Sequence, residues 1–369
     1  MRMVFLNSMV NHARYCKRIH AIEKLGVRVK VLAFERDSYP SKNLPGEYIS
    51  LGRINHGQYL RRLLILLSST NKVRRALRIT DVLYTFGLDM LILGWLALLG
   101  KSNRPKLIYE VGDIREILFD NSFAGGISRS IERFFVKRID LLVSTSPAYI
   151  SGYYKNVLGL HNLCFQVIEN KLDANQVRTE KEHLTPLKPD NKPLVIGYFG
   201  VLRCTHSWEI LKMIARESKG RVRIYVRGVP KNLKTFTEDL RSLSEIEYAG
   251  PYLSPDDLSS IYGQVDLIWA AHHHGKSNLL WSRVCRFYEA CFFRKPMIVQ
   301  GGTQDSLKVE KYGLGISVDL ADVSGTTNSV LAISAEELTQ WQKNFNRVPE
   351  DVYLYTNEHE RLVHAIQRR

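Results

Sequence analysis

Residues Trp281-Ser-Arg-Val-Cys-Arg-Phe-Tyr-Glu-Ala-Cys-Phe-Phe-Arg-Lys-Pro-Met-Ile-Val-Gln300 predict a helix that leads directly into a buried strand. Arg286 and Glu289 are three positions apart, so on a helix they lie on one face. A cation at the end of a βα unit can bind a phosphate, and a carboxylate beside it can accept hydrogen bonds from a ribose diol. The alternative interpretation is an exposed ion pair, which contributes little to stability or function.

Apolar, β-branched runs alternate with helical stretches along the rest of the chain, and a polar, proline-containing segment divides them into two series. Strands that alternate with helices indicate parallel, doubly wound sheets, which bind ligands at the carboxyl ends of their strands. The predicted fold is therefore α/β, with two Rossmann-like domains at residues 1–172 and 194–345, a linker at 173–193 and a C-terminal helical segment at 346–369. The expected strands are 3–6, 27–34, 48–51, 82–86, 107–111, 141–145 and 164–168, then 194–199, 222–226, 246–249, 267–270, 297–300 and 316–318.

The segment Arg-Phe-Tyr-Glu-Ala-x-x-Phe-x-Lys-Pro-x-Ile-Val, which starts at Arg286, resembles the nucleotide-sugar segment of GT-B glycosyltransferases, especially the bacterial "group 1" type. The resemblance implies a GT-B fold with a cleft between its domains and a C-terminal helix that crosses back to the first domain. It implies that Arg286 contacts the donor diphosphate, that Glu289 holds the ribose, and that Tyr288 lies in the nucleotide site. Many retaining members carry a second Glu where this chain has Trp281, which leaves an inverting reaction open.

Two loops of the second domain carry further candidate nucleotide ligands. The stretch Ile-Gly-Tyr-Phe-Gly200-Val-Leu-Arg203 ends a predicted strand and precedes a helix expected to begin at Ser207. Glycine lets a backbone approach a phosphate, and a helix N-terminus favours an anion. The stretch is similar to the family's Gly-x-x-Gly loop, which usually has an Arg directly after the second Gly, and this implies Gly200 and, two positions displaced, Arg203 as phosphate ligands. Arg227 and Gly228 end another strand, where relatives often have a glycine-rich turn that faces the nucleotide.

The stretch His272-His-His-Gly-Lys276-Ser-Asn278 allows two interpretations. One is a zinc site, but adjacent histidines on an extended loop cannot all point at one ion, and no carboxylate lies at ligand spacing. The other is a loop that faces the donor phosphate and sugar, with His272, Lys276 and Asn278 as polar contacts. The resemblance implies that no metal and no other cofactor is needed, because side-chain cations stabilise the departing diphosphate.

In the first domain, Lys106-Leu-Ile-Tyr-Glu-Val-Gly-Asp113 is an apolar strand that ends in a charged turn. The family often places a His or Asp in this turn near the acceptor hydroxyl, so Asp113 is the candidate catalytic base for an inverting reaction. The alternative is that Asp113 caps a helix that begins at the next residue.

Composition restricts the classes of protein that the chain can be. It has 369 residues, 45% of them hydrophobic, and a formal net charge of +15, which favours a polyanionic neighbour such as nucleic acid, anionic lipid or a phosphorylated substrate. Its five cysteines are scattered, without a C-x-x-C pair, so neither a disulfide framework nor a zinc site is expected. The N-terminal residues predict a strand rather than a signal peptide, and no apolar run is long enough to span a bilayer. We therefore expect a cytoplasmic location.

The region from Arg53 to Arg78 places Arg61, Arg62, Arg74 and Arg75 around a long aliphatic run at helical spacing. This pattern is typical of an interfacial helix that rests on anionic lipid, and an ordinary core helix with a basic face is the alternative. Aromatic residues do not interleave with these cations as they do in single-strand-binding grooves. Lipid is therefore a better partner than nucleic acid for this segment.

The resemblance, together with the basic aliphatic segment, implies an enzyme that transfers a sugar from a nucleotide-sugar, expected to be UDP-linked, to a lipid-linked or growing saccharide at the inner face of a bacterial membrane. Assembly of exopolysaccharide, capsule or lipopolysaccharide O-antigen is the expected setting. Two alternatives remain at this point. A nucleotide-sugar 2-epimerase shares the GT-B architecture, and a non-catalytic nucleic-acid-binding protein would account for the charge.

Overall fold

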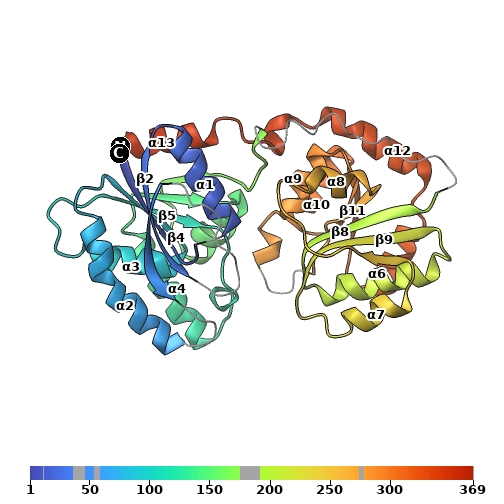
Figure 1. Ribbon diagram of the computed structural model, residues 1–369, viewed down its shortest axis with the longest axis horizontal. Coiled ribbons are helices and arrows are strands. Elements are labelled where there is room, and N and C mark those ends of the chain that lie inside the picture. The colour runs from blue at the N-terminus through green and yellow to red at the C-terminus, as the bar shows by residue number, and fades with distance from the viewer. Residues whose placement is uncertain (11, 36–45, 54–58, 175–191, 274–277, 369) are drawn as a thin grey trace. The chain divides into compact units, whose positions relative to one another are not determined.

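The computed structural model describes residues 1–10, 12–35, 46–53, 59–174, 192–273 and 278–368. By its internal contacts the chain divides into two compact units (Figure 1). The first comprises Met1–Glu169 and Asn357–Arg369, and the second comprises Asn170–Thr356. Each unit is built around one sheet, and all of the strand pairs in both sheets are parallel.

The first unit has seven strands in the order β3-β2-β1-β4-β5-β6-β7. Helices α2, α3 and α4 cover one face of this sheet, and α1 and α13 lie on the other (Figure 1). The strands are β1 (Arg2–Asn7), β2 (Arg28–Glu35), β3 (Glu47–Arg53), β4 (Val82–Phe86), β5 (Lys106–Val111), β6 (Leu141–Ser144) and β7 (Phe165–Val167). The helices are α1 (Ala13–Lys24), α2 (Tyr59–Ala76), α3 (Leu88–Leu98), α4 (Phe123–Val136), α13 (Glu358–Gln367), a short 3-10 helix at Glu116–Leu118 and a π-helix at Tyr149–Val157.

The second unit has six strands in the order β10-β9-β8-β11-β12-β13. The strands are β8 (Leu194–Leu202), β9 (Val222–Pro230), β10 (Ile246–Tyr248), β11 (Leu267–Trp269), β12 (Met297–Gln300) and β13 (Gly315–Val318). The helices are α6 (Thr205–Glu217), α7 (Phe236–Ser242), α8 (Leu258–Gly263), α9 (Cys285–Phe292), α10 (Gln304–Tyr312), α11 (Val323–Leu331) and α12 (Ala335–Asn344), with short 3-10 turns at Asn278–Leu280, Phe345–Arg347 and Glu350–Val352.

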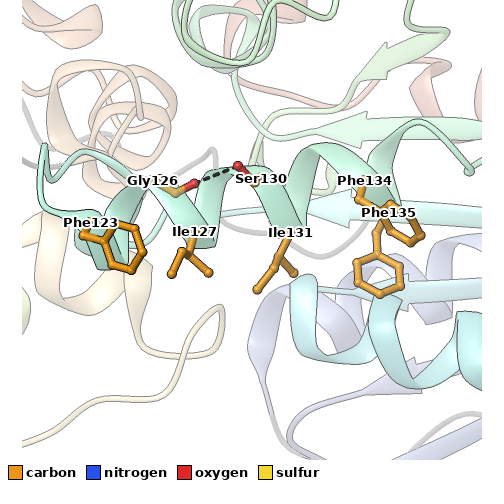
Figure 2. A pocket seen from close by; sticks show the side chains of 7 residues that line it. All are labelled: Phe123, Gly126, Ile127, Ser130, Ile131, Phe134 and Phe135. Atoms are coloured by element: carbon orange, nitrogen blue, oxygen red, sulfur yellow. Dashed lines mark hydrogen bonds between the residues drawn. The ribbon is translucent and has the colours of Figure 1, made fainter.

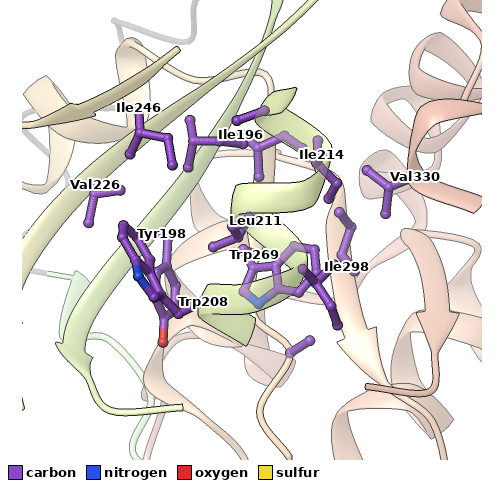
Figure 3. Close-up of a cluster of buried hydrophobic side chains, with 14 of the residues drawn as sticks. Ile196, Tyr198, Trp208, Leu211, Ile214, Val226, Ile246, Trp269, Ile298 and Val330 are labelled. Atoms are coloured by element: carbon purple, nitrogen blue, oxygen red, sulfur yellow. The ribbon is translucent and has the colours of Figure 1, made fainter. Parts of the chain in front are cut away.

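Both faces of the second sheet are buried under helices. On one face, Trp208 and Leu211 of α6 pack over Ile196 and Tyr198 of β8 (Figure 3). On the other face, a second cluster joins α8, α9 and α10 to the same strands. Strands covered on both faces need apolar side chains at nearly every position, which is why they are recognisable in the sequence as continuous apolar runs.

All thirteen predicted strands are present, and the predicted α/β fold with two parallel sheets is confirmed. The end of β8 was predicted too early, because β8 continues beyond Gly200 and pairs with β9 as far as Leu202. The helix that follows does not begin at Ser207. It begins at Thr205, and the Sγ atom of Cys204 accepts a hydrogen bond from the Ser207 backbone N–H at 3.4 Å. None of the described helices is long and apolar enough to cross a membrane.

A buried charged network holds α13 against the rest of the first unit. Arg18 on α1 donates to Glu110 Oε2 on β5 (Nε–Oε2 3.0 Å), to His359 Nε2 on α13 (2.7 Å) and to the Ile168 carbonyl oxygen (3.4 Å). The hydroxyl of Tyr84 donates to the same Glu110 carboxylate. One guanidinium group therefore joins three segments that are far apart in the sequence.

We expect the free energy of unfolding to fall as the pH is lowered from about 6.5 toward 3, in part because of His359. Burial and the neighbouring Arg18 charge lower the pKa of His359 to about 3 in the folded protein. Between these pH values the unfolded chain binds the extra proton, so acidification favours unfolding by at most about 1.4 kcal/mol per pH unit. His359→Gln keeps an acceptor for Arg18 and should flatten this part of the profile, measured by urea unfolding at each pH. An unchanged profile would assign the dependence to other groups.

Candidate functional site

The strand order of the second unit reverses between β8 and β11. In open α/β sheets, ligands bind beyond the carboxyl ends of the strands at such a reversal. Here the segments that leave these ends are Arg203-Cys204 after β8 and Ala270-Ala271-His272 after β11. The predicted phosphate ligand Arg203 and the predicted polar contact His272 therefore both lie at the expected place.

Arg286 is held at the same edge of the sheet. It lies in the first turn of α9, is half-buried, and donates from Nη1 to the carbonyl oxygen of Trp269, the last residue of β11, at 3.0 Å. Its guanidinium carbon lies 5.3 Å from the centroid of the Tyr198 ring on β8. The hydrogen bond and the ring contact fix one cation at the strand reversal.

His272 shows that positive charge accumulates at this point. Burial, followed by the charges of Arg286 and Arg203, lowers the pKa of His272 to about 3, so this imidazole is neutral at physiological pH. Its Nδ1 atom is buried and has no hydrogen-bond partner among the described residues. Two arginines and an imidazole beside the strand ends form a site suited to an anion such as a diphosphate.

Glu289 is not part of an exposed ion pair, so that alternative interpretation is wrong. Its side chain is 5% exposed and accepts a hydrogen bond from the Tyr262 hydroxyl at 2.8 Å. Burial, and then the Glu289 carboxylate, raises the pKa of Tyr252, which places Tyr252 near this group. The hydrogen bond from Tyr262 fixes the orientation of this buried carboxylate. Tyr288 is 1% exposed and belongs to the hydrophobic core behind α9, so the structure places it behind the strand-end surface.

Arg227 and Gly228 shape the neighbouring loop. Arg227 donates to the carbonyl oxygens of Gly250 (3.1 Å) and Pro251 (2.7 Å), and so fixes the loop that follows β10. Gly228 pairs with Gly200 across β8 and β9, and a Cβ atom on Gly228 would lie 1.8 Å from the Gly200 carbonyl oxygen. Only glycine permits this approach. Direct contacts from these residues to a nucleotide remain predictions.

Two of the predicted donor contacts cannot be placed. Lys276 lies outside the described residues, and Asn278 begins a short 3-10 helix but its side chain is outside them too. Within the described part of the chain, no three His, Cys, Asp or Glu residues come together as a metal site. That the reaction needs no metal ion remains a prediction from the sequence.

In the first unit, Asp113 lies just beyond the carboxyl end of β5, and its side chain is 67% exposed. The N-cap interpretation is wrong, because the 3-10 helix that follows begins at Glu116 and has Arg115 at its N-cap. Asp113 instead faces Arg14 of α1, with Nη2 of Arg14 3.7 Å from its Oδ2 atom. The catalytic role of Asp113 remains a prediction.

Arg14 and Asn7 lie near Asp113 and the strand reversal of the first unit, and neither was predicted from the sequence. The Arg14 guanidinium lies directly on Gly112, where an added Cβ would be 1.9 Å from Cζ. Asn7 ends β1, next to the strand reversal between β1 and β4, and its buried amide has no hydrogen-bond partner among the described residues. No local sequence signal marks either residue, because only the sheet order brings the end of β1, the start of α1 and the end of β5 together.

Comparison with known proteins supports the fold. No family model matches the chain. The chain is 29% identical over 307 residues to the succinoglycan biosynthesis protein ExoL of Rhizobium meliloti (strain 1021), a match that spans 81% of this chain and 76% of ExoL. Sucrose-phosphate synthase from Thermosynechococcus elongatus superposes with a TM-score of 0.75 at 12% identity, over 100% of this chain and 99% of the synthase. Anabaena Alr3699/HepE, in complex with UDP and glucose, superposes with a TM-score of 0.69 at 14% identity, over 100% of both chains.

At these low identities the two solved structures resemble this chain in fold alone, whereas ExoL resembles it in sequence. The solved structures agree with the two parallel-sheet units. The chain therefore has the fold of these solved structures, and the predicted GT-B fold is confirmed.

Proposed function

We propose that this protein transfers a sugar from a nucleotide-sugar to a saccharide acceptor during assembly of a bacterial surface polysaccharide. The observation that carries the proposal is the group of Arg203, His272 and Arg286 at the strand reversal of the second unit, with the buried carboxylate of Glu289 on the same helix as Arg286. The relationship to ExoL, a succinoglycan biosynthesis protein, supports polysaccharide assembly as the setting.

The chemistry requires that negative charge on the departing diphosphate be stabilised. As the bond between the sugar C1 atom and the phosphate oxygen breaks, Arg286 and Arg203 would hold the growing charge, and positioned cations of this kind stabilise a leaving group without a metal. The acceptor hydroxyl oxygen forms the new bond to C1, and in an inverting reaction its proton passes to the Asp113 carboxylate. Glu289 would accept hydrogen bonds from the ribose hydroxyls and orient the donor.

UDP is the nucleotide to test first, because Anabaena Alr3699/HepE shares the fold and is described in complex with UDP and glucose. We further propose a lipid-linked acceptor and attachment to an anionic membrane surface from the cytoplasmic side. Arg74 and Arg75 at the end of α2 are exposed, as attachment to a membrane surface requires. The side chains of Arg61 and Arg62 are not among those that the structure describes.

Arg286→Ala and Glu289→Gln should each weaken UDP binding by about 1–3 kcal/mol, because each removes a charge-assisted hydrogen bond. Gln at position 289 keeps an acceptor for Tyr262, so the helix should stay in place. Isothermal titration calorimetry measures the affinities. The matched controls Arg223→Ala and Glu217→Ala remove exposed charges from β9 and α6 and should leave them unchanged. Equal affinities in all four variants would remove Arg286 and Glu289 from the site.

Calorimetry does not distinguish a transferase from a nucleotide-sugar 2-epimerase, because both bind the same donor. A transferase releases the nucleoside diphosphate in proportion to the added acceptor, whereas an epimerase changes the donor sugar without any acceptor. Retention of DNA that falls steeply with salt, together with no UDP binding, would instead favour the nucleic-acid-binding alternative.

A further inference from the structure

Helix α4 carries an apolar stripe on the side that faces solvent. Phe123 is 86% exposed, and Ile127, Ile131 and Phe134 are exposed as well. Their spacing of four, four and three residues places all four on one helix face. Figure 2 shows Phe123, Ile127 and Ile131 projecting from the same side of the helix, along a shallow depression also lined by Gly126, Ser130, Phe134 and Phe135. An exposed apolar stripe of this kind marks an interaction site.

The opposite side of α4 is anchored by a carboxylate. Glu132 is buried, and it accepts hydrogen bonds from the hydroxyls of Tyr153 (2.6 Å), Tyr154 (3.0 Å) and Tyr109 (3.2 Å). Burial raises the pKa of the Glu132 carboxyl, and the three tyrosine hydrogen bonds oppose this rise. An ordinary amphipathic helix turns its apolar face to the core, but here the core side holds this polar cluster. The outward apolar stripe is therefore not required to attach α4 to the sheet.

The rim of the stripe is cationic. Between residues 121 and 139 the basic residues are Arg129, Arg133, Lys137 and Arg138, and Glu132 is the sole acidic one. Arg133, Lys137 and Arg138 are exposed, and the guanidinium of Arg138 lies 3.5 Å from the centroid of the Phe134 ring. Because the single carboxylate is buried, the surface of α4 presents apolar groups and positive charge.

Helices α2 and α3 lie on the same face of the sheet as α4 (Figure 1). The residues in and around them add aromatic and positively charged groups to this face. Trp95 of α3 packs edge-on against Phe135, with ring centroids 5.3 Å apart. Beyond α3, burial and then the charges of Arg74 and Arg78 lower the pKa of Lys101, so three cations lie close together there. Indole rings and clustered cations are the groups that favour the headgroup region of an anionic bilayer.

We propose that the outer face of α4 docks on a bilayer that contains anionic lipids. Phe123, Ile127 and Ile131 would enter the boundary between headgroups and acyl chains, and Arg133 and Lys137 would contact lipid phosphates. A second copy of this chain is a poorer occupant, because a two-fold interface would bring the same cations together. The inference rests on the proposed function, since an enzyme that extends a lipid-linked saccharide meets its acceptor at the membrane.

The test is sedimentation with vesicles of phosphatidylcholine and phosphatidylglycerol at low salt. Phe123→Glu combined with Ile127→Glu should weaken vesicle binding by about 100-fold, because each change removes one apolar side chain from the bilayer, worth about tenfold. UDP affinity should be unchanged. Leu307→Glu, which alters an exposed leucine on α10 of the second unit, is the matched control and should bind vesicles normally.

Two further variants keep the test decisive if the double variant does not fold. Phe123→Trp retains an apolar ring, and its emission should shift to the blue when anionic vesicles are added. Arg133→Glu with Lys137→Glu should weaken binding to anionic vesicles, high salt should do the same to the native protein, and neutral vesicles should show no such difference.

The proposal is overturned if the native protein does not bind anionic vesicles, or if the α4 variants bind them normally. It is also overturned if vesicle binding is abolished only when the charges of Arg74 and Arg75 are reversed. That result would place the membrane contact on α2. A native dimer that becomes monomeric in the double variant, with unchanged vesicle binding, would make the stripe an interface between copies. Failure to bind UDP would refute the proposed function but would leave the vesicle result standing.

Discussion

Asp113→Asn is expected to lower turnover by about 10²–10⁴-fold while the protein stays folded. Asp113 lies at the carboxyl end of β5, its side chain is 67% exposed, and Arg14 Nη2 lies 3.7 Å from its Oδ2 atom, so the proposed base is accessible to solvent and oriented by a cation. Asparagine keeps the size of the side chain but cannot take a proton. Steady-state rates with saturating donor and acceptor, together with the melting temperature, measure both parts of the expectation.

The matched control is Glu116→Gln, an exposed acidic residue three positions later, which should leave turnover nearly unchanged. Near-normal turnover of Asp113→Asn would remove Asp113 from the mechanism. The anomeric configuration of the product, measured by NMR, is an independent test. A product with the configuration of the donor would rule out the simple inverting scheme that Trp281 left open.

Arg18→Met should lower the free energy of unfolding by about 3–5 kcal/mol, measured by urea denaturation. Arg18 and Glu110 are 2% and 1% exposed, so removal of the cation leaves a buried carboxylate without its charged partner. The same change also releases His359 on α13.

The control is Arg2→Met, which breaks the exposed Arg2–Asp81 pair and should cost about 0–1 kcal/mol. In the double variant Arg18→Met/Glu110→Gln, part of the lost stability should return, because no unpaired buried charge remains. If Arg18→Met costs no more than Arg2→Met, the network does not hold α13 in place.

The strands were predictable because both sheets are covered on each face, so that each strand is a short apolar run bounded by polar residues. The end of β8 was not predictable, because a glycine such as Gly200 usually indicates a loop rather than the interior of a strand. In the folded chain Gly200 pairs with Gly228, and the close approach of the two backbones lets both strands continue. This pairing depends on two glycines 28 positions apart, which no local pattern reveals.

The candidate site was predictable where its residues share one element. Arg286 and Glu289 are three positions apart on α9, so a helical pattern was enough to place them on one face. The partners that hold them, Trp269 and Tyr262, come from other elements and could not be predicted. The orientation of α4 was equally inaccessible, because Glu132 turns inward only where tyrosines from β5 and the π-helix meet it.

Sugar transfer itself is tested most directly by incubation of the protein with UDP-hexoses and lipid-linked saccharides extracted from a bacterium that makes succinoglycan. Mass spectrometry follows the acceptor and the free nucleotide in the same sample. We expect the acceptor to gain one sugar for each UDP released, with neither product formed when the acceptor is omitted and both strongly reduced in Arg286→Ala. Conversion of the donor into its epimer without any acceptor, or the absence of UDP release with every donor and acceptor, would contradict the proposal that this protein is a glycosyltransferase.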